Sequence, residues 1–164
     1  MAYIDLKKCT VTITDGTSTT PLSITVKIGD GNITWDETRN IEYKKDRGLL
    51  DTAREGDQEP VDVSMDFAWI FVKGDSGDSA PVSIHDAIKG VGSASAWKSS
   101  ATGDVCAPYA VTITVLYTPC TGGGKTETYI LTDYRWEKLN YDPKAGMIKT
   151  SGKCNINAIG GVRT

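Results

Sequence analysis

The sequence VDVSMDFAWIF at residues 61–71 alternates apolar and polar side chains over its first seven positions. Successive side chains of a β-strand point to opposite faces of a sheet, so this alternation predicts a strand with one buried face. A period of two, or a strand-like composition, recurs in six further segments: residues 9–14, 22–28, 31–44, 111–117, 127–140 and 146–157. The chain is therefore expected to be rich in β-strands.

Turn residues separate these segments. Asp, Gly and Pro within residues 15–21 predict a hairpin connection, and the glycine-rich run at 121–124 predicts a second turn. Residues 81–90 break the alternation, and there Ser83 as an N-cap and Gly90 as a stop predict a short helix. The expected architecture is mainly β: a sandwich or barrel of antiparallel strands with one short flanking helix and long loops.

Length and charge predict a soluble protein of one domain, covering residues 1–164. A chain of 164 residues can bury a core of its own, and it shows neither a composition break nor a repeat. Eighteen Lys and Arg against twenty-one Asp and Glu argue against a dedicated nucleic-acid binder. No apolar run is long enough to span a bilayer. Charges at residues 5–8 stand where a signal peptide needs apolar residues, so we expect a cytoplasmic chain with reduced cysteines.

The short motifs that suggest catalysis each lack a necessary part. GDSG at 74–77 is similar to the nucleophile motif of chymotrypsin-like proteases, but the only histidine, His85, follows the serine and the chain is too short for that fold. GGGKT at 122–126 lacks the first glycine of a phosphate-binding loop and precedes a strand-like segment. One histidine and four scattered cysteines do not predict a zinc site. We therefore expect no enzymatic activity, no metal and no cofactor.

The connection at about 45–60 is the most unusual segment of the sequence. Both signs of charge surround the apolar pair Leu49-Leu50. An apolar centre with a charged rim is typical of a contact between subunits. The alternative is a solvated loop whose two leucines fold back onto the core. A second long connection, at about 91–108, is rich in Ser, Ala and Gly.

The blocks RGLLDTAREGD at 47–57, Glu59-Pro60 and VDVSMDF at 61–67 together resemble the major tail tube proteins of tailed bacteriophages. The opening DLKKCTVTI at 5–13 is similar to the same family. The resemblance implies six-membered rings whose sheets form an inner β-barrel, and it implies that the rings stack into a hollow tube that conducts DNA during ejection. It also implies that a long loop between two strands contacts the neighbouring ring. In this chain that interface is expected to contain Arg47, Leu49, Leu50, Asp51, Arg54 and Glu55.

Acidic residues are concentrated in and around this segment. Residues 36–66 contain ten acidic and five basic side chains, a local balance of −5. A negative bore would repel DNA phosphates and let the genome slide. We expect some of Asp36, Asp62 and Asp66, on the polar faces of their strands, to face the lumen.

The resemblance also implies the partners and the location. The partners would be further copies of the chain, the tape-measure, baseplate or initiator and terminator proteins, and a sheath protein in a contractile tail. DNA would pass without specific binding, no membrane would be involved, and the virion tail would assemble in the host bacterial cytoplasm.

Two alternatives stay open. One is a related ring or tube component, such as a secretion-system tube subunit, a tail terminator or a baseplate protein. The other is a monomeric carbohydrate-binding β-sandwich, in which Trp35, Trp97 and Trp136 could stack on sugars.

Overall fold

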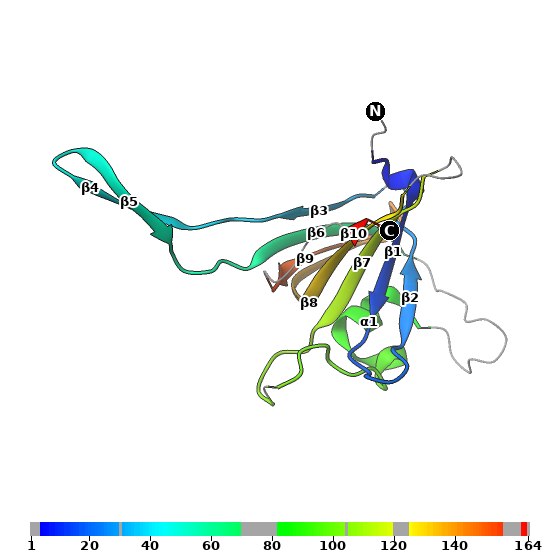
Figure 1. Cartoon of the computed structure of the whole chain (residues 1–164). Coiled ribbons are helices and arrows are strands. Elements are labelled where there is room, and N and C mark those ends of the chain that lie inside the picture. Colours follow the sequence, from blue (N-terminus) through cyan, green and yellow to red (C-terminus); the bar gives the residue numbers. More distant parts are fainter. Residues whose placement is uncertain are drawn as a thin grey trace.

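Antiparallel strands contain about half of the described residues of the computed structural model (Figure 1), which describes residues 4–29, 31–69, 82–103, 105–119, 125–155 and 162–163. The helical elements are η1 (Leu6–Lys8), α1 (Ile84–Lys89) and η2 (Gly92–Ala94). The strands are β1 (Cys9–Thr14), β2 (Ser23–Val26), β3 (Ile33–Asp36), β4 (Ile41–Asp46), β5 (Leu49–Glu55), β6 (Val61–Ala68), β7 (Val111–Tyr117), β8 (Glu127–Asp142), β9 (Met147–Cys154) and β10 (Val162–Arg163). The expected mainly β, antiparallel fold with one short α-helix is confirmed.

One bent strand, β8, joins two half-sheets. The strand order is β2-β1-β7-β8-β9-β6-β3, with β10 paired to β8, whereas β4 and β5 pair only with each other. The first part of β8 pairs with β7, and the part from Arg135 onward pairs with β9. At the bend the ladder is irregular, and Asp133 has a φ of 54°. Ser100 and Asn155 donate hydrogen bonds of 2.7 and 2.8 Å to the Asp133 carboxylate, which holds this bulge in place.

The core lies between the two half-sheets. The apolar side chains of residues 61–67 are all buried in it, and they alternate with polar ones on the opposite face, as predicted. Trp35 on β3 contacts Tyr129 on the first part of β8, with 5.4 Å between ring centroids. The layers are thus packed in a sandwich-like arrangement. The expected strand ran on to Phe71, but residues 70 and 71 lie outside the described part of the chain.

Helix α1 closes one end of this core. Its buried side chains are Ile84, Ala87 and Ile88. Ser83 is the N-cap, and Gly90 ends the helix in the left-handed region with a φ of 67°. The predicted helix at 81–90 is confirmed over a shorter span, and residue 81 lies outside the described residues.

Two sequence predictions between residues 31 and 60 are wrong in detail. The single strand expected at 31–44 is two strands, β3 in the main sheet and β4 in a separate sheet. The loop expected at 45–60 consists mostly of the β4–β5 hairpin (Figure 1). The physical reason is the turn at Arg47-Gly48, where φ values of 48° and 84° give a two-residue hairpin turn of the type whose twist matches the flanking strands.

Candidate assembly surfaces

Residues 37–60, which we call the arm, project away from the rest of the molecule (Figure 1). The arm leaves the main sheet at the end of β3 and returns at the start of β6. Every residue of β5 is exposed, as is all of β4 except the half-buried Ile41. Three of its apolar or aromatic side chains are among the most exposed in the described chain: Leu49 at 76%, Leu50 at 63% and Tyr43 at 60%.

The register of the hairpin gives the arm two different faces. Residues directly opposite each other in an antiparallel pair share a face. One face carries the charged or polar pairs Glu42–Arg54 and Lys44–Thr52, and near the tip the pair Asp46–Leu49. A bulge between Lys44 and Lys45 brings Leu50 opposite Lys45, so the second face gathers most of the apolar side chains: Ile41, Tyr43, Leu50 and Ala53.

Few forces within the arm itself hold it together. An isolated two-stranded hairpin is only marginally stable in water. Its ion pairs, Glu42–Arg54 and Arg39–Glu55, join exposed side chains and add little stability, although the Arg39 guanidinium lowers the pKa of Glu55 by hydrogen bonding. Covering the apolar face with another surface would therefore stabilise the arm more than these pairs do.

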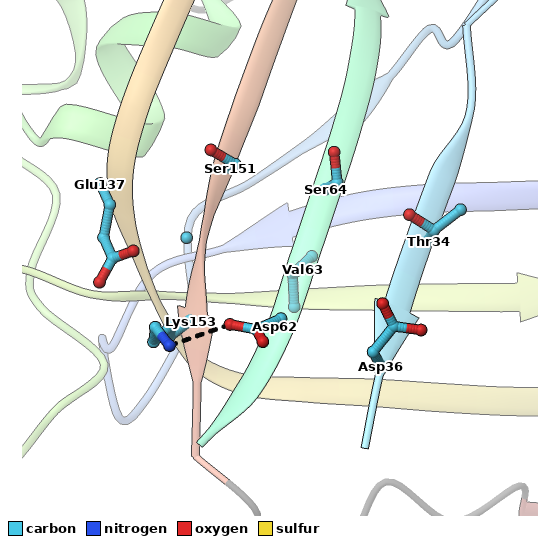
Figure 2. A pocket seen from close by; sticks show the side chains of 9 residues that line it. Thr34, Asp36, Asp62, Val63, Ser64, Glu137, Ser151 and Lys153 are labelled. Carbon is cyan, nitrogen blue, oxygen red and sulfur yellow. Dashed lines mark ion pairs between the residues drawn. The ribbon is translucent and has the colours of Figure 1, made fainter. Parts of the chain in front are cut away.

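A second surface is the polar face of the half-sheet formed by β3, β6, β9 and the last part of β8. We call this surface the polar face, and its members are Thr34, Asp36, Asp62, Ser64, Asp66, Glu137, Lys138, Asn140, Lys149, Ser151 and Lys153. Two shallow hollows lie on it, and Figure 2 shows the one at the end with Asp36 and Lys153. The three acidic residues that the sequence suggested for a lumen thus lie on one face.

Lysines interrupt the acidic character of the polar face. Lys153 Nζ lies 3.0 Å from Asp62 Oδ1, and Lys149 is opposite Asp66 in the register (Figure 2 draws the first pair). Asp36 is opposite Asp62. Strands β3 and β6 therefore contribute acids, and β9 contributes lysines. Sequence reasoning missed these lysines because it summed charge only over residues 36–66, although the alternation at 147–153 carries their signal.

The serine, histidine and aspartate at the start of α1 do not form a catalytic relay. Ser83 Oγ and Asp86 Oδ1 lie 3.4 and 3.6 Å from the same nitrogen, Nε2 of His85. A relay needs the nucleophile and the acid on opposite ring nitrogens. Burial opposes ionisation of Asp86, but hydrogen bonds from Ser93 and Ser83 outweigh it and lower the pKa of that carboxyl. Asp86 thus fixes the segment after α1 in place.

Other ligand-binding features are weak in the described part of the chain. It contains no cluster of His, Cys, Asp or Glu side chains suited to a metal ion, and no helix there is long and apolar enough to cross a membrane. Of the three tryptophans considered for sugar stacking, Trp97 is buried, Trp35 packs against Tyr129, and Trp136 is 40% exposed. A shared stacking platform is therefore not formed by these three rings.

Cys9 and Cys154 form no disulfide with another described residue. Burial raises the pKa of Cys154 to about 11, so this thiol stays protonated and packs as a small apolar group. Cys120 and the motifs at 74–77 and 122–124 lie outside the described residues.

Comparison of the chain with protein-family models, with curated proteins and with solved structures found no match. The resemblance in residues 47–67 therefore stays a prediction. The arm, the polar face and the sequence pattern are the features of the chain that indicate a function.

Proposed function

We propose that this chain is a structural subunit whose copies form rings, and that the rings stack into a hollow tube of the phage-tail type. The observation that carries the proposal is the arm, an exposed hairpin with an apolar face and a charged face. A hairpin of this kind gains most of its stability from a surface that covers its apolar side. A neighbouring copy of the chain would supply that surface.

The position of the arm favours an open assembly. Its tip, with Arg47, Leu49 and Leu50, lies far from the body, so it can contact a different surface on the next copy (Figure 1). Contacts between two different surfaces generate rings or, where they repeat along an axis, filaments. Asp51, Arg54 and Glu55 extend the same contact toward the body. The number of six subunits in each ring comes from the family resemblance.

The polar face suits the wall of a conduit. Its acids would repel DNA phosphates, and the Asp62–Lys153 ion pair reduces the attraction that a free lysine would exert on them. Its hollows are lined by short polar side chains such as Ser64 and Ser151 and by no aromatic ring on which a DNA base could stack. DNA would then pass without specific binding, in a virion tail that also contains initiator, tape-measure and terminator proteins.

Electron microscopy of the purified protein tests the proposal, with a purified initiator complex added if the protein is monomeric. We expect hollow tubes from the wild type. Leu50→Asp should leave a folded protein, judged by circular dichroism, that forms no tubes, because it places a charge on the apolar face. The control is Val105→Asp, which adds the same charge at an exposed apolar residue outside the arm and should retain tubes.

Three outcomes would count against the proposal in different ways. A wild type that stays monomeric even with initiator would exclude tube formation. Single rings that never stack would favour a terminator or baseplate protein. Normal tubes from Leu50→Asp would remove the arm from the interface.

A further inference from the structure

A cavity of about 190 Å³ opens between the two half-sheets, at the end of the core away from α1. Tyr109, which precedes β7, donates a hydrogen bond to the carbonyl oxygen of Ala87 in α1, whereas the cavity is lined by Tyr117, the last residue of β7. The short helix η1, whose Leu6 also lines the cavity, lies at this second end in Figure 1. The cavity is therefore the open mouth of the sandwich-like core.

Side chains from both half-sheets line the cavity. Cys9 is opposite Tyr117, and Val115 is opposite Tyr129, in the registers of β1, β7 and β8. These four residues therefore lie on the core side of one half-sheet. Trp35 on β3 belongs to the other half-sheet, and its ring centroid is 5.4 Å from that of Tyr129. Three aromatic rings thus meet at the cavity from two layers.

The lining is neutral. Among the described residues, no charged side chain lines this cavity, and most of the lining is aliphatic or aromatic. The hollow in Figure 2, by contrast, is lined by charged residues such as Asp62 and Lys153. A charged ligand in the cavity would lose water without gaining a counter-charge. The lining therefore selects a neutral ligand that is mostly apolar.

We propose that this cavity binds one small neutral aromatic molecule of the phenol class, a single ring with one hydroxyl group. An apolar cavity of about 150 Å³ is large enough for benzene, so the volume here fits one substituted ring. Aromatic rings gain from contact with each other beyond the area they bury, and Trp35, Tyr117 and Tyr129 offer such contacts from both half-sheets. All these residues belong to one copy, so the inference does not depend on the assembly proposed above.

Asn32 gives the ligand's hydroxyl group a partner at the mouth of the cavity. The residue is exposed and lines the cavity. Its Oδ1 accepts a hydrogen bond of 2.9 Å from the backbone nitrogen of Ile33, which fixes the orientation of the amide. Its Nδ2 can then donate to the oxygen of a phenol whose ring lies inside the cavity.

The competing occupant is a leucine from the arm of another copy. Leu49 and Leu50 are exposed apolar side chains of suitable size. The three aromatic rings and the amide at the mouth favour an aromatic ligand with a polar group over an aliphatic side chain. The experiment below separates the two occupants.

Cys9 reports on the cavity from within. Phenol bound there should slow alkylation of this thiol by iodoacetamide at least about fivefold once its concentration exceeds about four times the Kd. Mass spectrometry of the peptides measures each cysteine separately. The exposed Cys106 is the internal reference, and its rate should not change.

Nuclear magnetic resonance titration of the full-length chain measures affinity and selectivity. Phenol should give saturable shifts with a Kd of about 1 mM or tighter. Benzoate carries a charge on the same ring and should bind at least about tenfold more weakly.

Two variants locate the ligand. Cys9→Phe fills the cavity and should weaken phenol binding at least about tenfold, whereas the control Leu22→Phe adds the same ring at an exposed residue outside it. Asn32→Ala changes only an exposed side chain, so it tests the site without disturbing the core. It should weaken phenol at least about threefold and leave toluene, which lacks the hydroxyl group, within about twofold.

Several results would overturn the inference. The cavity is not a phenol site if phenol gives no saturable shifts, if benzoate binds equally well, or if folded Cys9→Phe binds phenol like the wild type. A third result would identify the other occupant. If Cys9 becomes protected without phenol as the protein concentration rises, and Leu50→Asp removes that protection, the cavity receives the arm of another copy and the proposed ligand is wrong.

Discussion

Strands β5 and β6 follow each other in the chain, and each pairs with antiparallel neighbours. The side chains of β5 face solvent, whereas half of those of β6 face the core. All seven residues of β5 are exposed, whereas every second residue of β6 is buried in the core. Strand β6 is held by apolar burial, which stabilises by roughly 25 cal/mol per Å². Strand β5 is held by a turn, one partner strand and exposed ion pairs. Regular β structure therefore has two different sources of stability in one molecule.

The largest expected loss of folding stability comes from a substitution in the core, outside the arm. Phe67 of β6 is fully buried in the core. Phe67→Ala removes its packing and leaves a cavity, so it should lower the free energy of unfolding by about 3–5 kcal/mol. Urea denaturation followed by tryptophan fluorescence would measure this. A loss below about 1 kcal/mol would show that the core around β6 collapses to fill the space.

Asp15 gives the next largest expected loss of folding stability, through the hydrogen bonds of a buried carboxylate rather than through apolar burial. Its carboxylate accepts hydrogen bonds from Leu22 N at 2.8 Å, Lys98 N at 3.1 Å and Thr17 Oγ1 at 2.6 Å. These bonds tie the β1–β2 connection to the segment at 95–100. Asp15→Ala leaves the donors without a partner and should cost about 2–3 kcal/mol of folding stability, measured by denaturation.

The same carboxylate predicts an acid dependence. Burial raises the pKa of Asp15, but the hydrogen bonds from Thr17, Lys98 and Leu22 outweigh it, so the pKa in the folded protein is lowered. The contribution is therefore complete above the unfolded value of about 3.9 and is lost as pH falls through the folded value. The stability difference between wild type and Asp15→Ala should shrink below about pH 4. A constant difference down to pH 2 would mean that the carboxylate does not titrate with folding.

The buried strand β6 could be predicted from the sequence, whereas the exposed strand β5 could not. Burial imposes a period of two, so the sequence predicted β6 and the exposed face of Asp62 and Asp66. The sequence of β5, LLDTARE, shows no such period because no face of it is buried in the chain. Its turn was also missed, because Arg47 is not one of the Asn or Asp residues that usually mark this turn.

The polar face was predictable only in part, for a different reason. The positions of Asp36, Asp62 and Asp66 follow from local alternation. The placement of Lys149 and Lys153 beside them depends on the β6–β9 register, which links residues far apart in the chain. The bend of β8 at Asp133 has no local sequence signal, because hydrogen bonds from Ser100 and Asn155 hold it.

The smallest expected effect on folding is in the arm. Leu49 at the tip is 76% exposed, so Leu49→Ser should change the free energy of unfolding by less than about 0.5 kcal/mol. The same variant should reduce tube length or raise the protein concentration needed for tubes, because the apolar side chain of Leu49 contributes to the contact with another copy and not to the core of its own chain. Urea denaturation and electron microscopy of one preparation would measure both.

Limited proteolysis sharpens this contrast without any substitution. Arg47 and Arg54 are exposed in a hairpin that the body does not support, so trypsin should cut the monomer there first and leave the core strands intact. In assembled tubes the same bonds should resist cleavage, because the neighbouring copy covers the arm. Mass spectrometry of the fragments identifies the bonds that are cut. Equal cleavage of the arm in monomers and tubes would mean that no neighbouring copy covers it. The proposal that the arm is stabilised by assembly, and the rest of the chain by its own core, would then be wrong.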